Sequence, residues 1–185
     1  MPVDLDDIQK VFEEAECLYT RDEVEAAIRG MAEHITERLA ESNPLVFAVM
    51  NGGLVFCGKL LTHLHFPLES SYMHATRYRN GLHAGALDWK VPPHRELADR
   101  TILVIDDILD EGHTLSAIME HCHNAGARDV LSAVLVDKKH DRKAVPGLRS
   151  DFCGLSCEDR YIFGYGMDYK GYWRNAPGIY ALKSQ

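Results

Sequence analysis

Residues 102–115, with the sequence ILVIDDILDEGHTL, decide the fold of this chain. The apolar and largely β-branched run at 102–105 predicts a buried strand, and the apolar-periodic segment from Leu115 predicts a helix. Between them lie two adjacent carboxylates, Asp106 and Asp107, and a turn at 110–114 that contains a third acid and a glycine. This order is typical of open α/β sheets, which bind ligands beyond the carboxyl ends of their strands.

The residues at this junction indicate the ligand. Backbone N–H groups at the start of a helix favour an anion such as phosphate. Asp106 and Asp107 would be costly to desolvate without partners, and ribose hydroxyls or a divalent cation are suitable ones. The junction therefore suggests a phosphorylated ribose. The alternative is a solvated acidic loop in which Thr114 merely caps the helix.

The rest of the chain predicts one domain, 1–185, with a parallel sheet flanked by helices. A capping box of Thr20 and Glu23 begins an amphipathic helix that runs to about residue 41. The turn Asn51-Gly52-Gly53 leads into a second helix that runs to about residue 64, and Gly126 stands where the helix predicted from Leu115 onward should end. The irregular stretch 79–100 predicts a long functional loop rather than regular structure. Strands are expected at 45–50, 68–77, 130–137, near 151–156 and at 161–164.

Composition narrows the class of protein. The 185 residues are 46% hydrophobic, which is enough for a substantial core. A formal charge of −8 argues against nucleic acid or an anionic membrane as the main partner. The acidic N-terminus lacks the features of a signal peptide, and no apolar run is long enough to span a membrane. Five cysteines without a CxxC pair predict free thiols in a cytoplasmic protein.

Two motifs together carry a resemblance to a known family. The segment 102–115 and the run DRYIFGYGMDYKGYWR at 159–174 resemble type I phosphoribosyltransferases, and specifically the hypoxanthine-guanine phosphoribosyltransferases. The resemblance extends from about Leu45 to Arg174. It implies a parallel sheet flanked by helices, a small hood formed by terminal segments, Mg²⁺ as the cofactor, and assembly as a homodimer or homotetramer.

The resemblance also assigns roles to individual residues. Asp110 would be the catalytic base, and Lys138, Tyr161 and Ile162 would bind the purine, with Lys139 as the alternative to Lys138. The phosphoribosyl group would be bound by Asp106, Asp107, Glu111, Gly112, His113 and Thr114. Pyrophosphate would be bound by Arg174 and by the loop Met50, Asn51, Gly52 and Gly53, whose backbone in the family adopts a non-proline cis peptide. Asp168 would be the metal-linked acid, with Asp106 and Asp107 acting through ribose or water, and Arg77 and Tyr78 would begin a mobile flap over the site.

Several of these residues depart from the family pattern. Asn51 stands where lysine is frequent, and Arg77 stands where serine is usual. In the phosphate turn Glu111 replaces a common threonine, and His113 occupies a variable position. A carboxylate beside a phosphate costs energy unless its side chain points outward. These changes concern the contacts of the site more than its function.

The resemblance implies an enzyme of purine salvage. It would transfer the 5-phosphoribosyl group from phosphoribosyl diphosphate to N9 of a 6-oxopurine, hypoxanthine or guanine, and release IMP or GMP with pyrophosphate. A xanthine phosphoribosyltransferase is the alternative among enzymes. A nucleotide-sensing regulator that keeps the fold without turnover is the alternative from another class, and the retention of Asp110, Lys138, Asp168 and Arg174 argues against it.

Overall fold

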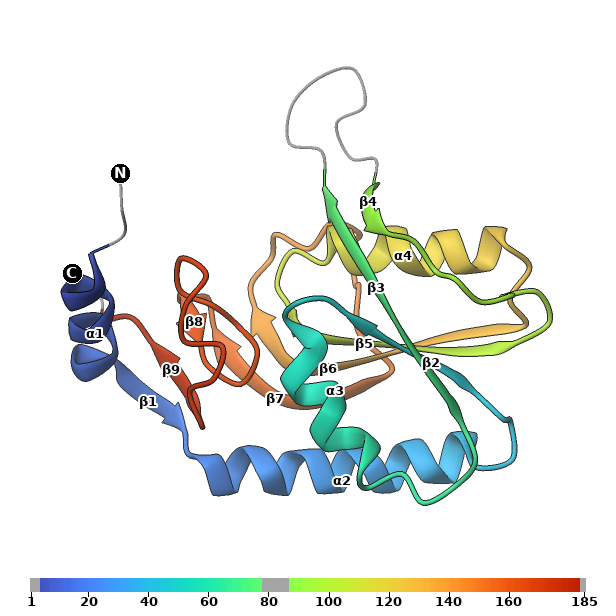
Figure 1. Cartoon of the computed structure of the whole chain (residues 1–185), viewed down its shortest axis with the longest axis horizontal. Coiled ribbons are helices and arrows are strands. Elements are labelled where there is room, and N and C mark those ends of the chain that lie inside the picture. Colours follow the sequence, from blue (N-terminus) through green and yellow to red (C-terminus); the bar gives the residue numbers. More distant parts are fainter. Residues whose placement is uncertain (1–3, 78–86, 184–185) are drawn as a thin grey trace.

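The computed structural model describes residues 4–77 and 87–183 of the chain. Helices and strands alternate through most of these ranges (Figure 1). In chain order the elements are α1 (Leu5–Glu14), β1 (Glu16–Tyr19), α2 (Arg21–Leu39), β2 (Leu45–Val49), α3 (Gly53–Leu61), β3 (Glu69–Arg77), β4 (Leu87–Val91), β5 (Thr101–Leu109), α4 (His113–Asn124), β6 (Asp129–Lys139), β7 (Phe152–Glu158), β8 (Ile162–Phe163) and β9 (Ile179–Ala181).

The larger sheet has the strand order β4-β3-β2-β5-β6-β7 within the described ranges. Neighbouring strands from β3 to β7 are parallel, and β4 pairs antiparallel to β3 at one edge. In the register of β5 with β6, Leu109 lies opposite Asp137. Asp110 therefore leaves its strand beside Lys138, so two residues far apart in sequence meet at the same edge of the sheet.

Helices cover both faces of this sheet. Figure 1 shows α2 and α3 on one face and α4 on the other. Side chains of β5 alternate between the two cores: Leu103 and Ile105 join the cluster under α2 and α3, whereas Ile102 and Val104 join the cluster under α4. Because both faces are buried, the strand is an unbroken apolar run rather than an alternating one.

Helix α2 begins as its sequence predicts. Thr20 and Glu23 form the capping box, with the Glu23 carboxylate 2.8 Å from the backbone N of Thr20. Its buried face includes Val24, Ile28 and Ile35. In residues 4–77 and 87–183, no helix combines the length and apolarity that crossing a bilayer requires.

The terminal segments form the expected hood beside the larger sheet (Figure 1). Strands β1, β9 and β8 pair antiparallel in the order β1-β9-β8. Phe12 of α1 stacks on Trp173 with ring centroids 4.5 Å apart, and the Trp173 indole donates a hydrogen bond of 2.8 Å to the carbonyl of Ile8. Segments from both ends of the chain therefore pack together, which the sequence pattern alone did not indicate.

Several expected boundaries differ from the structure. The stretch 79–100 is not wholly irregular, since β4 occupies Leu87–Val91, while residues 78–86 lie outside the described residues. The strand predicted at 102–105 continues to Leu109 and so includes Asp106 and Asp107. Pairing with a neighbouring strand over Asp106 to Leu109 provides the reason. Helix α4 begins at His113, before Thr114, because Gly112 at φ 80° serves as the N-cap.

Candidate active site

A cavity of about 880 Å³ opens at the carboxyl ends of β2 and β5. This volume lies at the upper end of the range that holds small ligands and cofactors. It is lined by residues from the two turns that follow these strands, from β3 and from the C-terminal run. Of the residues predicted for the site, the cavity is lined by Met50, Asn51, Gly52, Asp106, Asp107, Asp110, Glu111, Gly112, His113, Thr114, Asp168 and Arg174.

The predicted purine residues do not line this cavity but lie at its margin. Lys138 is buried and contacts Asp110, which does line it. Tyr161 is 50% exposed, and its hydroxyl donates a 3.0 Å hydrogen bond to the carbonyl of Asp168. Ile162 is buried and pairs with β9. Gly53, the fourth residue of the predicted pyrophosphate loop, is buried in the first turn of α3.

The adjacent acids of β5, Asp106 and Asp107, line the cavity. Asp107 is 8% exposed, and its backbone N–H donates a 3.0 Å hydrogen bond to the Asp106 carboxylate. Burial and the neighbouring negative charge of Asp107 raise the pKa of Asp106 well above its usual value. Burial raises the pKa of Asp107, although hydrogen bonds and the charge of Arg174 oppose that rise. The pair would be stabilised by a cation or by hydroxyl donors.

The loop at 50–53 approaches these acids closely. The Met50–Asn51 peptide is cis, as the family resemblance implies. A Cβ on Gly52 would lie 2.0 Å from Oδ2 of Asp107, so only glycine fits here without displacing that carboxylate. On its other side, Gly52 O would lie 2.0 Å from a Cβ at Gly166.

The predicted phosphate turn presents backbone groups at the start of α4. Gly112 adopts φ 80° as the N-cap, and it lines the cavity together with His113 and Thr114, the first two residues of α4. The Glu111 carboxylate lies 3.2 Å from Nη1 of Arg142 and 3.4 Å from Nε2 of His113. Arg142 therefore offsets the charge that would oppose a phosphate.

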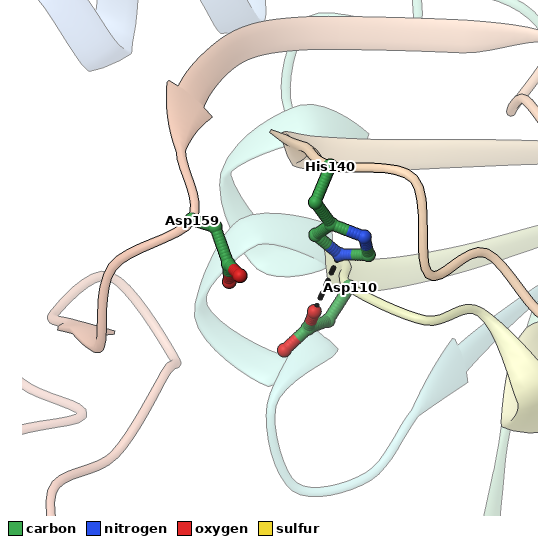
Figure 2. Close-up of side chains that lie close together, drawn as sticks. All are labelled: Asp110, His140 and Asp159. Atoms are coloured by element: carbon green, nitrogen blue, oxygen red, sulfur yellow. Dashed lines mark hydrogen bonds and ion pairs between the residues drawn. The ribbon is translucent and has the colours of Figure 1, made fainter.

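Asp110 is held on both of its carboxylate oxygens. Lys138 Nζ lies 3.0 Å from Oδ2, and His140 Nε2 lies 2.8 Å from Oδ1. Figure 2 shows this contact between His140 and Asp110. Partial burial raises the pKa of Asp110, but hydrogen bonds from Lys138 and His140 and the positive charge of Lys138 outweigh it and lower the pKa below its usual value. The carboxylate is therefore ionised at neutral pH and able to accept a proton.

Arg174 and Asp168 form an ion pair in the C-terminal run. Arg174 Nη2 lies 2.5 Å from Oδ1 of Asp168, and Oδ2 of Asp168 accepts a 2.7 Å hydrogen bond from Gly171 N. Arg174 Nη1 also donates to the carbonyl of Gly166 at 2.6 Å. Arg174 therefore contacts the predicted metal-linked acid, Asp168, through Nη2. Through Nη1 it contacts Gly166, which lies against Gly52.

The two flap residues can be placed only in part. Arg77 is the last residue of β3, and Tyr78 lies outside the described residues. The cavity is, however, lined by the three residues of β3 that immediately precede Arg77, namely His74, Ala75 and Thr76. These three residues were not predicted for the site, since no motif in the sequence of β3 marks it as part of a ligand site.

The segment after β6 supplies contacts that sequence analysis missed. Lys143 Nζ donates at 2.8 Å to the carbonyls of Leu109 and Asp110 and to the carboxylate of Asp137. Ala144 N donates to the carbonyl of Glu111 at 2.7 Å. These bonds hold the turn that carries Asp110. The cluster of basic residues at 138–143 could have indicated these contacts, but in sequence it is indistinguishable from a solvated charged loop.

Two groups of residues, one around the cavity and one beside it, carry atoms that could bind a metal ion. Asp106, Asp107 and Asp168 offer carboxylate oxygens around the cavity, which suit a hard cation such as Mg²⁺. Elsewhere, Asp110, His140 and Asp159 hold three donor atoms within 4.8 Å of one another. Both acids of this second group already bind cationic side chains, because Arg142 Nη2 lies 2.5 Å from Asp159 and Lys138 Nζ lies 3.0 Å from Asp110.

Comparison with known proteins shows the family to which the chain belongs. The phosphoribosyl transferase domain family matches residues 15–170, so the chain belongs to this family. The hypoxanthine-guanine-xanthine phosphoribosyltransferase of Tritrichomonas foetus is 32% identical over 179 residues, which cover 97% of this chain and 94% of that protein. The hypoxanthine-guanine phosphoribosyltransferase of Bacillus subtilis is 31% identical over 178 residues, covering 96% and 94%.

Solved structures give the same fold. A hypoxanthine-guanine-xanthine phosphoribosyltransferase superposes with a TM-score of 0.84 at 30% identity, covering 93% of this chain and 99% of that chain. A hypoxanthine phosphoribosyltransferase from Staphylococcus aureus superposes with a TM-score of 0.86 at 22% identity, covering 93% and 94%. The fold predicted from the sequence, a parallel sheet flanked by helices with a terminal hood, is confirmed.

Proposed function

We propose that this chain is a purine salvage enzyme that transfers the 5-phosphoribosyl group of phosphoribosyl diphosphate to N9 of hypoxanthine or guanine. The products are IMP or GMP and pyrophosphate. One observation carries the proposal: a buried lysine donor and a carboxylate acceptor, Lys138 and Asp110, stand 3.0 Å apart beside the phosphate turn. The names of the similar full-length relatives support it.

The lysine–aspartate pair is complementary to one edge of a 6-oxopurine. In such a base the C6 carbonyl oxygen, an acceptor, lies next to N7–H, a donor. Lys138 donates to the carbonyl while Asp110 accepts from N7. Adenine carries an amino group at C6, so a donor would face the buried Lys138 and binding would be strongly disfavoured.

Asp110 then acts as the proton acceptor. As N9 bonds to the anomeric carbon, the ring becomes cationic and N7–H becomes acidic. An ionised carboxylate beside N7 takes that proton even though its own pKa is low. Bond formation at N9 is accompanied by loss of pyrophosphate from the same carbon, which leaves the nucleotide neutral at the base.

The remaining predicted residues bind the sugar and its phosphates. The N–H groups at the start of α4 and the Thr114 hydroxyl receive the 5′-phosphate. Asp106 and Asp107 receive the ribose hydroxyls. The loop at Met50–Gly53 and Arg174 receive pyrophosphate, with the arginine as the charged partner that Asn51 does not provide.

Magnesium suits the same site. The oxygens of Asp106, Asp107 and Asp168 are donors of the type this ion prefers, and a cation would offset both the burial of Asp106 and the neighbouring charge of Asp107, which together raise the pKa of Asp106. When bound, the ion neutralises charge on the departing pyrophosphate. Asp168 and Arg174 orient each other through their ion pair.

We also propose a cytoplasmic homodimer or homotetramer. All five cysteines lie in the described ranges and are free thiols, which suits a reducing compartment. Exposed apolar side chains on α3 and β3, Leu54 and Tyr72, are candidates for a subunit contact.

The test is turnover with separate bases. Pyrophosphate release from phosphoribosyl diphosphate would be measured with hypoxanthine, guanine, xanthine and adenine, with Mg²⁺ and after its chelation. Asp110→Asn should reduce kcat by roughly 10²- to 10⁴-fold, the usual contribution of a general base. Asp7→Asn, an exposed acid of α1, is the matched control.

The outcomes separate the alternatives. Turnover of hypoxanthine or guanine that requires Mg²⁺ supports the proposal. Turnover of xanthine as well would match the relative from Tritrichomonas foetus, whose name includes that base. Nucleotide binding without turnover of any base would refute the enzyme and favour a regulator.

A further inference from the structure

His140 is a nearly enclosed histidine with a defined hydrogen bond on each ring nitrogen. Its side chain is 5% exposed. Nδ1 accepts a 3.0 Å hydrogen bond from the backbone N–H of Arg142, and Nε2 lies 2.8 Å from Oδ1 of Asp110. Because Nδ1 must keep its lone pair to accept, the ring proton belongs on Nε2, where it is donated to the carboxylate.

These bonds also exclude metal binding by the group Asp110, His140 and Asp159, whose side chains lie close together in Figure 2. A metal ligand needs a ring nitrogen with a free lone pair, and Nδ1 uses its lone pair on the Arg142 N–H. Nε2 carries the proton. Lys138 and Arg142 already supply positive charge to Asp110 and Asp159, so a cation here would be repelled.

We propose that His140 is a positioning residue for the reaction, acting as a neutral Nε2–H donor that fixes the carboxylate of Asp110 against the purine. The inference deepens the proposed function and rests on it. With Oδ1 bound to His140, the carboxylate cannot rotate about its terminal bond, and Oδ2 beside Lys138 stays aimed at the base edge. No proton passes through the imidazole, which orients the acceptor and does not touch substrate.

A neutral donor suits this place better than a second cation. Lys138 already lowers the pKa of Asp110, and further positive charge would weaken the carboxylate as a proton acceptor. A hydrogen bond from neutral imidazole orders the carboxylate with less loss of basicity. Protonation of His140 would also remove the acceptor for the Arg142 N–H. The charged and titratable groups that face Asp110 and His140 come from β6, the segment after it and the β7 end: Lys138, Arg142, Lys143, Cys157 and Asp159.

The first experiment uses the wild-type protein and does not depend on turnover. Long-range ¹H–¹⁵N correlation spectra of the full chain report which nitrogen of each histidine is protonated. At neutral pH we expect His140 as the Nε2–H tautomer, with His140→Gln assigning its signals. An Nδ1–H tautomer or an imidazolium would overturn the proposal, even if the enzyme is active.

The second experiment compares two substitutions at the same position. His140→Phe keeps a ring of similar size without the donor, whereas His140→Gln can return an N–H near the position of Nε2. For His140→Phe we expect kcat to fall roughly 10- to 100-fold, a fraction of the whole general-base contribution. KM for phosphoribosyl diphosphate should change less than about twofold, because the phosphate turn keeps its other contacts.

The pH profile separates positioning from simple packing. Losing the His140 donor should raise the pKa of Asp110, so the acid limb of kcat/KM for His140→Phe should move to higher pH. His140→Gln should recover most of kcat and restore the acid limb. His123→Gln, at an exposed histidine of α4, is the control and should behave as wild type.

Each failure has its own signature. If wild type turns over no 6-oxopurine, the proposed function fails and the tautomer still tests the geometry. If wild type is active and His140→Phe keeps its kcat and pH profile, the positioning role is refuted. If His140→Phe does not fold, failure of His140→Gln to restore the wild-type acid limb refutes it instead.

Discussion

Gly166 links the pyrophosphate loop to the C-terminal run, and Gly166→Ala should break that link. Its φ is +110°, and an added Cβ would lie 2.0 Å from the carbonyl oxygen of Gly52. Its N–H donates to the carbonyl of Arg174 at 2.9 Å, and its own carbonyl accepts from Arg174 Nη1 at 2.6 Å. A methyl group must therefore push apart two segments that are both predicted to bind pyrophosphate.

The cost has two parts. A non-glycine residue held at positive φ costs about 1–3 kcal/mol. Relief of a contact this short requires backbone to move, because the opposing atom is a carbonyl oxygen rather than a flexible side chain. Overpacking of this kind costs about 1–3 kcal/mol more. The free energy of unfolding should fall by about 2–6 kcal/mol, and Tm should fall by about 2–4 °C for each kcal/mol.

Gly171→Ala is the matched control. Gly171 has φ +88°, and a Cβ there would meet nothing within 4 Å. It should lose only the conformational part, about 1–3 kcal/mol. Thermal unfolding of both variants gives the difference, and titration with phosphoribosyl diphosphate gives its effect on the site. We expect weaker binding for Gly166→Ala alone. Equal losses of Tm and unchanged binding in both variants would refute the steric argument.

Three further predictions concern charge. Asp106→Asn should abolish turnover and should also raise Tm at neutral pH. Because the pKa of Asp106 is raised in the folded state, ionisation of this carboxyl destabilises the fold as pH rises above the unfolded pKa. Thermal scans at several pH values would test the effect on Tm, and a lower Tm at neutral pH would contradict it. Asp137 shows the opposite sign: although burial raises its pKa, Lys143 and Lys139 lower it overall, so its stabilisation is complete above about pH 4 and is lost as pH falls through the folded pKa. Acid unfolding of Asp137→Asn should therefore start from a lower stability and depend less on pH, and an unchanged curve would count against the pair. Arg142→Ala should raise KM for phosphoribosyl diphosphate by roughly two- to fivefold, as expected from an exposed pair worth up to about 1 kcal/mol, and initial-rate kinetics with unchanged KM would show that Glu111 does not oppose the phosphate.

The parts predicted correctly from sequence depend on neighbours along the chain. Thr20 and Glu23 lie three residues apart, so their capping box is visible in the sequence. The apolar run before Asp106 and the glycine before α4 are equally local signals. The resemblance to a family then supplied roles that no local pattern contains, such as that of Lys138.

The parts that were missed depend on contacts between distant segments. Strand β4 is an exception, because its sequence LDWKV alternates apolar and polar residues as a strand does, but the glycines and prolines on either side of it predicted a loop. The approach of Gly166 to Gly52 joins positions separated by more than half of the chain. His140 became a candidate only once Asp110 was found within 2.8 Å of it. Such pairs are set by tertiary packing, which a single sequence taken by itself does not reveal.

The charges of the site explain how an acidic chain can bind a polyanionic substrate. Three acids near the cavity already have cationic partners: Asp110 has Lys138, Glu111 has Arg142, and Asp168 has Arg174. Each pair removes repulsion that the substrate would otherwise meet. Among residues 4–77 and 87–183, no salt bridge reaches Asp106, and burial and Asp107 raise its pKa. The negative charge left over is concentrated at the end of β5, where the ribose hydroxyls and a divalent cation would lie. The net charge of −8 therefore does not oppose the substrate at its phosphates, and the proposed divalent cation would offset the charge of Asp106 and Asp107, where Arg174 compensates Asp107 only in part.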